Sequence, residues 1–214
     1  IQDEPYFQTQ MGACKKRIGI ITASLGEAEV VSVFGLAPQP LLMYLGYLLH
    51  DEPDIRVFQK FRGKPFGWSW LEDQQVNAFQ VDRLFDYDNT KSAEVSEVNL
   101  IISVSAEIAI ARINAVKSAN IPTYVLRSAY QGLDAIRSEQ DTNDFISTFR
   151  REAIEQIRQD FPQASIINLF PAMPASLPVR IGMNYLKNVD VEWRMYNHRG
   201  EDGFVCAVSI KGGS

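Results

Sequence analysis

The chain of 214 residues is 46% hydrophobic and 22% charged, which is typical of a folded globular protein and not of a disordered one. Its formal net charge of −5 argues against a protein that grips long DNA or RNA, because such proteins carry a basic face. No apolar run approaches about 18 residues and no signal-peptide pattern opens the chain, so we expect a cytoplasmic protein. The two cysteines, Cys14 and Cys206, are expected to be reduced thiols, since two are too few for a metal-binding knuckle.

Short apolar runs rich in β-branched residues alternate along the chain with helix-like patterns. The runs expected to form strands are 17–23, 30–36, 55–61, 98–104, 121–126, 164–170, 189–196 and 204–210, with another strand starting at 68–70. Four helices are expected. The first starts at Pro38 to Pro40 and stops at 51–54, the second covers 106–116, the third runs from Asp141 or Thr142 to Phe161, and the fourth covers 175–186. Residues 1–14 are expected to be a linker or tail, and 72–97 a short strand with loop. This alternation predicts an α/β fold with largely parallel sheets, in which ligands bind outside the carboxyl ends of the strands.

One segment of the chain occurs twice. Residues 33–46 (V-F-G-L-A-P-Q-P-L-L-M-Y-L-G) match residues 169–182 (L-F-P-A-M-P-A-S-L-P-V-R-I-G) at a constant separation of 136, as Phe170 stands to Phe34 and Gly182 to Gly46. A fixed offset kept by apolar residues, prolines and glycines is typical of an internal duplication. The sequence therefore predicts two Rossmann-like halves, about 15–97 and 98–214, related by a pseudo-two-fold axis.

Each copy of the repeat places a helix start directly after a strand. Unpaired amides at such a start favour an anion, so the backbones of Leu41 and Leu42, and of Ala175 and Leu177 with the Ser176 hydroxyl, are candidate phosphate contacts. Two such sites facing each other would suit a ligand with two phosphates. The alternative is that these residues only pack the core.

Cations and aromatic residues recur near the repeat. Arg56, Lys60, Arg62 and Lys64 follow the first copy, and Arg194, His198 and Arg199 follow the second. They are candidates for a phosphate-binding rim, with nearby Phe61, Trp68, Trp70 and Tyr196 able to stack on bases. Ser103 and Ser105 end a predicted strand, where a hydroxyl can face a ligand or be satisfied in the core. A solvated turn is the alternative for the cations. No nucleophile paired with a base is apparent, and neither a metal nor a cofactor is expected.

Several stretches together resemble the SAVED domain of bacterial anti-phage (CBASS) effectors. They are V-F-G-L-A-P-Q-P-L-L-M-Y-L-G-Y-L-L, I-R-V-F-Q-K-F-R and G-W-S-W in the first half, and L-F-P-A-M-P-A-S-L-P-V-R-I-G and M-Y-N-H-R-G-E-D-G-F in the second. The resemblance covers roughly residues 15–211. It implies two fused CARF-like halves that bind a cyclic di- or trinucleotide between them. It also implies that binding drives self-association and activates a fused effector, most similar to an HNH nuclease, that is not part of this chain.

We therefore expect a non-enzymatic receptor for a cyclic oligonucleotide, without direct DNA or membrane binding. The candidate ligand-binding residues, chosen by repeat position and side-chain chemistry, are Pro38, Gln39, Pro40, Leu41, Lys60, Phe61, Arg62, Trp70, Ser103, Ser105, Ala175, Ser176, Leu177, Tyr196, His198 and Arg199. Two alternatives stay open: a phosphodiesterase that cuts the same messenger, and a purely structural oligomerisation module. Ring size, base identity and linkage depend on pocket shape, on which the sequence is silent.

Overall fold

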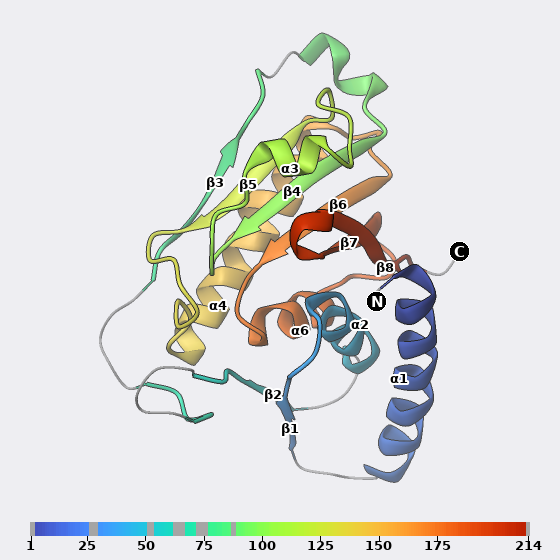
Figure 1. The fold of residues 1–214 in the computed structure, drawn as a ribbon, viewed down its shortest axis with the longest axis vertical. Helices are drawn as coiled ribbons and strands as arrows, with labels where there is room; N and C mark the ends of the chain where they lie inside the picture. Colours follow the sequence, from blue (N-terminus) through green and yellow to red (C-terminus); the bar gives the residue numbers. More distant parts are fainter. Residues whose placement is uncertain are drawn as a thin grey trace.

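A computed structural model describes residues 3–25, 30–50, 54–61, 67–71, 77–86 and 89–212 (Figure 1). The elements in chain order are α1 (Glu4–Leu25), β1 (Val31–Phe34), α2 (Gln39–Leu49), β2 (Ile55–Phe58), β3 (Phe79–Arg83), η1 (Asn89–Glu94), β4 (Glu97–Ser103), α3 (Ile110–Asn114), β5 (Thr123–Ser128), α4 (Glu139–Thr148), η2 (Phe149–Ile154), α5 (Glu155–Asp160), β6 (Ile166–Ala172), α6 (Ser176–Met183), β7 (Glu192–His198), η3 (Gly200–Asp202) and β8 (Phe204–Ile210). Among the helices of these ranges, none is both long and apolar enough to cross a membrane.

The strands form two sheets. The larger has the order β3-β5-β4-β6-β7-β8, in which β5, β4, β6 and β7 run parallel and the edge strands β3 and β8 run antiparallel to their neighbours. The smaller consists of β1 and β2, paired in parallel. The predicted α/β fold with largely parallel sheets is therefore confirmed. The central strands β4 and β6 are buried almost throughout, because structure covers both faces of the larger sheet.

Helices α2 and α6, which carry the two copies of the repeat, pack directly on each other. A Cβ atom added at Gly46 would lie 2.0 Å from the carbonyl oxygen of Val179, and one added at Gly182 would lie 2.0 Å from that of Met43. Val179 is the repeat partner of Met43, so the contact is reciprocal and follows the same 136-residue offset. The absence of a side chain at both glycines lets the two backbones touch.

Around these helices the two copies differ. Both form a parallel strand–helix–strand unit: β1–α2–β2 is the first unit and β6–α6–β7 the second. In the first, Ile55 pairs with Val31. The repeat equates these residues with Val191 and Ile167, but Ile167 pairs with Trp193, two residues further on. The strand registers therefore differ, and a pseudo-two-fold axis relating two complete halves stays a prediction.

The amino-terminal region was predicted wrongly. Residues 1–14 were expected to be a tail and 17–23 a buried strand, but from Glu4 onward they belong to the 22-residue helix α1. An apolar run alone does not distinguish a strand from a helix. The helix packs through Phe7, which is fully buried, whereas Ile20 and Ile21 are 59% and 48% exposed. Within the strand-like stretch, Ile18 packs partly buried against the core, while Ile20 and Ile21 face outward.

The helix predicted over 141–161 is confirmed but starts earlier. Ser138 is its N-cap, and its side chain accepts a hydrogen bond from the Asp141 amide while the Asp141 carboxylate accepts one from the Ser138 amide. Its middle, Phe149–Ile154, is a π-helix. The residues expected on its buried side are all buried: Phe145, Phe149, Ile154 and Ile157.

Two shorter elements were overestimated. The helix expected over 106–116 is reduced to α3, Ile110–Asn114. The expected strand start at 68–70 does not form; instead Gly67 makes an isolated antiparallel bridge with Phe61. The remaining predicted strands are present with ends displaced by a few residues, and β8 has the predicted bounds.

Candidate ligand-binding site

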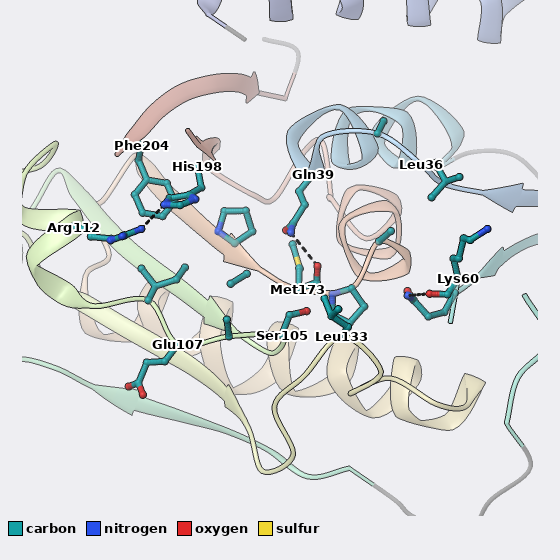
Figure 2. Close-up of a pocket in the computed structure, with 18 of the residues that line it drawn as sticks. Leu36, Gln39, Lys60, Ser105, Glu107, Arg112, Leu133, Met173, His198 and Phe204 are labelled. Carbon is teal, nitrogen blue, oxygen red and sulfur yellow. Dashed lines mark hydrogen bonds between the residues drawn. The ribbon is translucent and has the colours of Figure 1, made fainter. Parts of the chain in front are cut away.

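A cavity of about 810 Å³ lies where the carboxyl ends of strands from both sheets meet (Figure 2). Its walls come from the segments that follow β1, β2, β4 and β6, from α3 and from the loop after β5. The last residue of β7 and the first residue of β8 complete them. The lining residues are Leu36, Ala37, Gln39, Gln59, Lys60, Ser105–Ala109, Arg112, Leu133, Pro171–Ala175, His198 and Phe204. This is the edge of a parallel sheet at which ligands usually bind.

Basic residues lie on two opposite sides of the cavity. Figure 2 shows Lys60 on the side of β2, with Arg112 and His198 across the cavity on α3 and β7. All three side chains are exposed. The acidic lining residue is Glu107, whose carboxylate accepts a hydrogen bond from Arg127 Nη1 at 2.7 Å. Because Arg127 neutralises this carboxylate, the cavity keeps a positive character although the whole chain is acidic.

Arg112 and His198 contact each other directly. Arg112 Nη1 lies 2.5 Å from His198 Nε2. A guanidinium only donates hydrogen bonds, so Nε2 is the acceptor in this contact. The His198 ring also packs on Phe204, with ring centroids 5.1 Å apart.

Two glutamines link the units near the floor of the cavity. Gln39, at the start of α2, donates from Nε2 to the Met173 carbonyl at 3.0 Å. Gln59, after β2, accepts a hydrogen bond from the Ser176 amide at 3.1 Å and donates to the Lys60 carbonyl at 2.8 Å. Each glutamine of the first unit therefore holds the turn that begins α6.

Polar oxygens near the cavity lack a hydrogen-bond partner among the described residues. They are Gln39 Oε1 and Ser105 Oγ, both in residues that line it. The hydroxyls of Ser103 and Ser176, which do not line the cavity, are also buried without a partner. Buried polar atoms are almost always paired in native proteins. In the described part of the chain, no cluster of three or more His, Cys, Asp or Glu side chains is arranged to hold a metal ion.

Open amides were expected at both helix starts, but the structure shows those of Leu41, Leu42, Ser176 and Leu177 to be paired. The amides of Leu41 and Leu42 donate to the Pro38 carbonyl at 3.0 and 3.2 Å, and that of Leu177 donates to the Pro174 carbonyl at 3.1 Å. The Ser176 amide is held by Gln59. The expectation was wrong because the proline before each helix turns its carbonyl back onto the first turn, which satisfies donors that otherwise need an external acceptor.

The predicted site residues divide into three groups. Those that line the cavity are Gln39, Lys60, Ser105, Ala175 and His198. Those that lie elsewhere are Pro38, Pro40, Leu41, Phe61, Trp70, Ser103, Ser176, Leu177, Tyr196 and Arg199. Arg62, with its neighbour Lys64, lies outside the described residues.

Three of the four aromatic residues proposed for base stacking, Phe61, Trp70 and Tyr196, pack in or against the core instead. Tyr196 is 7% exposed and stacks on Phe170, with centroids 4.4 Å apart. Burial raises the pKa of its hydroxyl although the Lys117 ammonium lies close. Phe61 is 2% exposed and meets Trp70 edge to face at 6.4 Å. Leu177, a non-aromatic candidate on α6, is also fully buried.

Sequence reasoning missed several residues that line the cavity. The most important is Arg112; Leu36, Leu133 and Met173 provide apolar walls. The rule that ligands bind beyond the carboxyl ends of parallel strands points to residues 104–112, which follow β4. That signal was available for Arg112 and also for Leu133, which lies in the loop after the parallel strand β5.

Solved structures support this fold. The chain is similar to the Acinetobacter baumannii Cap4 SAVED/CARF-domain containing receptor with the cyclic trinucleotide 2′3′3′-cAAA, at a TM-score of 0.69 and 12% identity over 97% of this chain and 44% of that one. The same receptor with 3′3′3′-cAAA gives a TM-score of 0.67 and 15% identity over 96% and 44%. The Moraxella osloensis Cap4 SAVED/CARF-domain containing receptor gives a TM-score of 0.61 and 13% identity over 97% of this chain and 43% of that one. The chain thus spans less than half of the length of each of these proteins.

Sequence comparison gives a more direct assignment. No curated protein sequence matches the chain significantly. A family model does: the SMODS-associated and fused to various effectors sensor domain, SAVED, matches residues 15–210. The match covers most of the chain and agrees with the fold and with the resemblance noted in the sequence, so the chain belongs to the SAVED family of sensor domains.

Proposed function

We propose that this chain is a receptor for a cyclic oligonucleotide second messenger, which it binds in the cavity between the two units. Two of the similar structures carry cyclic trinucleotides, and the matching family is described as a sensor domain. The assignment to this particular cavity comes from its geometry.

The observation that carries the proposal is the placement of basic side chains on opposing walls. A cyclic oligonucleotide has a phosphate between each pair of nucleosides, so its charges point outward around a ring. Lys60 on one side, with Arg112 and His198 on the other, would meet phosphates at different points of such a ring (Figure 2). A volume of 810 Å³ is near the upper end of the range of about 300–1,000 Å³ for small-molecule sites, which favours a ligand larger than one nucleotide.

Neutral groups would hold the bases. Leu36, Leu133 and Met173 provide apolar surface at the mouth and wall, and Gln39 and Ser105 provide polar atoms. Leu36 and Leu133 are 69% and 53% exposed although both are apolar. A bound base would cover part of this surface, which is a favourable contribution to binding.

We further propose that the chain acts as the sensor of a CBASS anti-phage effector. In that role ligand binding drives self-association and activates a fused nuclease. This wider role is supported by the family resemblance. The alternatives make different predictions: a phosphodiesterase would consume the messenger, and a structural module would bind no nucleotide.

The test is thermal unfolding of the domain with a panel of cyclic di- and trinucleotides. A ligand present at 100 times its Kd adds about 2.7 kcal/mol to the free energy of unfolding, which raises Tm by several degrees. We expect one messenger to produce this shift and Lys60→Ala and Arg112→Ala to reduce it. The control is Arg158→Ala, which removes an exposed cation from α5, away from the cavity.

The alternatives are separated in the same samples. Chromatography of the messenger after long incubation detects cleavage, and light scattering detects ligand-dependent self-association. Flat melting curves across the panel, for a domain that unfolds cooperatively, would refute the receptor. A shift of the same size in both cavity variants and the control would move the ligand to another site.

A further inference from the structure

In the free domain, the hydrogen bond from Arg112 uses His198 Nε2 as its acceptor. At 2.5 Å from a guanidinium nitrogen, His198 Nε2 can only be an acceptor. Protonation would replace this acceptor with a donor and leave two cations facing each other. This contact lies in a part of the cavity where a ligand phosphate is expected.

A phosphodiester changes this balance because it carries only acceptors. If a phosphate oxygen takes the Arg112 N–H, then His198 Nε2 loses its donor and its lone pair faces an anion. Adding a proton to Nε2 converts that repulsion into a second charge-assisted hydrogen bond to the phosphate. Histidine is the side chain for which this change is accessible near neutral pH, between about pH 5 and 8.

The other charged groups around His198 do not gain a proton near neutral pH when a phosphate binds. Arg112 approaches it from α3; Arg199 and Glu201 lie on the turn that follows β7, and Phe204 of β8 packs on the ring without charge. Glu107 is held by Arg127, and Lys60 lies across the cavity (Figure 2). An anion placed between Arg112 and His198 would thus be the new partner of both.

Given the proposed receptor function, we propose that Arg112 and His198 form a phosphate subsite that takes up one proton, on His198, when the messenger binds. In the free domain Arg112 and His198 are hydrogen-bonded to each other, and the phosphate replaces this hydrogen bond with one to each residue. The affinity for the messenger therefore rises as the pH falls. Between about pH 8 and 6 we expect Kd to fall by up to about tenfold per pH unit, the limit for linkage to one proton.

The experiment is isothermal titration calorimetry with 3′3′3′-cAAA, or with the member of the thermal panel that raises Tm most. Titrations at one pH in buffers of different ionisation enthalpy, such as PIPES and Tris, give the number of protons taken up per messenger bound. We expect a value approaching about one for the wild-type domain. The key variant is His198→Gln, because glutamine can accept from Arg112 and donate to phosphate but cannot be protonated.

The chain supplies its own matched control. The other histidine of the chain, His50, is the C-cap of α2 and stacks on Tyr47 away from the cavity. His50→Gln should keep the proton uptake and His198→Gln should lose it while still binding. Uptake that persists in His198→Gln, or binding with no uptake and a flat pH profile, would overturn the subsite while leaving the receptor intact. If no member of the panel binds at any pH, the receptor and the subsite both fail.

Discussion

The two strand–helix–strand units share a sequence pattern but lie in different surroundings. In the first unit, β1 and β2 form a sheet of their own, and Phe34 on β1 is 52% exposed. In the second, β6 and β7 lie inside the six-stranded sheet, and Phe170, the repeat partner of Phe34, is fully buried. The same residue at the same repeat position is therefore a surface residue in one unit and a core residue in the other.

This difference shows which part of the repeat is structurally constrained. The reciprocal contact of Gly46 and Gly182 is common to both units, because each helix is the partner of the other. Burial of a strand instead depends on its neighbours. For the second unit these are β4 and β8, which lie outside the repeat and have no counterpart beside β1 among the described strands (Figure 1). Repetition in the sequence thus reports the helix pair more faithfully than the sheets.

The largest expected effect comes from truncating the two phenylalanines. Phe170→Ala removes a ring that packs against Tyr196 and Phe204 in the core, and should lower the free energy of unfolding by about 3–5 kcal/mol. Phe34→Ala removes an exposed ring stacked on Phe58, and should cost about 1 kcal/mol or less. Urea unfolding followed by circular dichroism measures both. Equal losses would mean that β1 is covered in solution.

Next in size are substitutions at the helix crossing, which should be equal in the two units. Gly46→Val and Gly182→Val each place a side chain against a backbone carbonyl 2.0 Å from the Cβ position, which no rotamer change relieves. We expect each to cost at least about 3 kcal/mol, the upper end of overpacking costs. The matched control is Gly12→Ala on α1, where nothing lies within 4 Å of the added Cβ. It should stabilise the helix by about 0.5–1 kcal/mol. A much smaller loss at one crossing glycine than at the other would contradict the reciprocal contact.

Much of the fold was predictable because local patterns determine it. The continuous apolar run over 98–104 marked β4, and prolines at 38 and 40 marked the start of α2. Helix α1 was not predictable in the same way, since its 17–23 stretch has the composition of a strand while the contact that anchors it lies at Phe7. The composition of a short stretch does not determine whether it forms a strand or a helix when the choice depends on packing against residues far away in the sequence.

The site was less predictable than the fold because it depends on side-chain direction. Lys60 and His198 were found from their positions beyond strand ends, and both line the cavity. Tyr196 stands two residues before His198 on the same strand, yet it packs on Phe170 in the core. Arg112 enters the cavity because α3 lies beyond the carboxyl end of β4. Such choices are made by packing between units and leave no mark on the local sequence.

The smallest expected effect tests how the second unit is tied to the sheet. Glu97 on β4 accepts hydrogen bonds from Lys117 Nζ at 2.7 Å and from Asn168 Nδ2 of β6 at 2.8 Å. Burial alone would raise the pKa of this carboxyl, but the hydrogen bonds from Lys117 and Asn168 hold it below its ordinary value. A carboxyl with a lowered pKa in the folded state stabilises the fold above its unfolded pKa of about 4.3, and this contribution is lost as the pH falls through the folded value.

The isosteric change Glu97→Gln should therefore destabilise the domain modestly at neutral pH and no longer do so in acid. The amide oxygen of Gln can still accept from Lys117 and Asn168, so only the charge is removed. Chemical unfolding at a series of pH values from about 7 to 3 should give wild-type and variant curves that converge below about pH 4. The control is Glu155→Gln, which removes a carboxylate at an exposed position of α5. A Glu97→Gln curve that stays parallel down to the lowest pH would show that the carboxylate charge does not hold β4 to β6. The second unit would then be held in the sheet by its apolar contacts, backbone pairing and neutral hydrogen bonds such as that from Asn168 to Asn99.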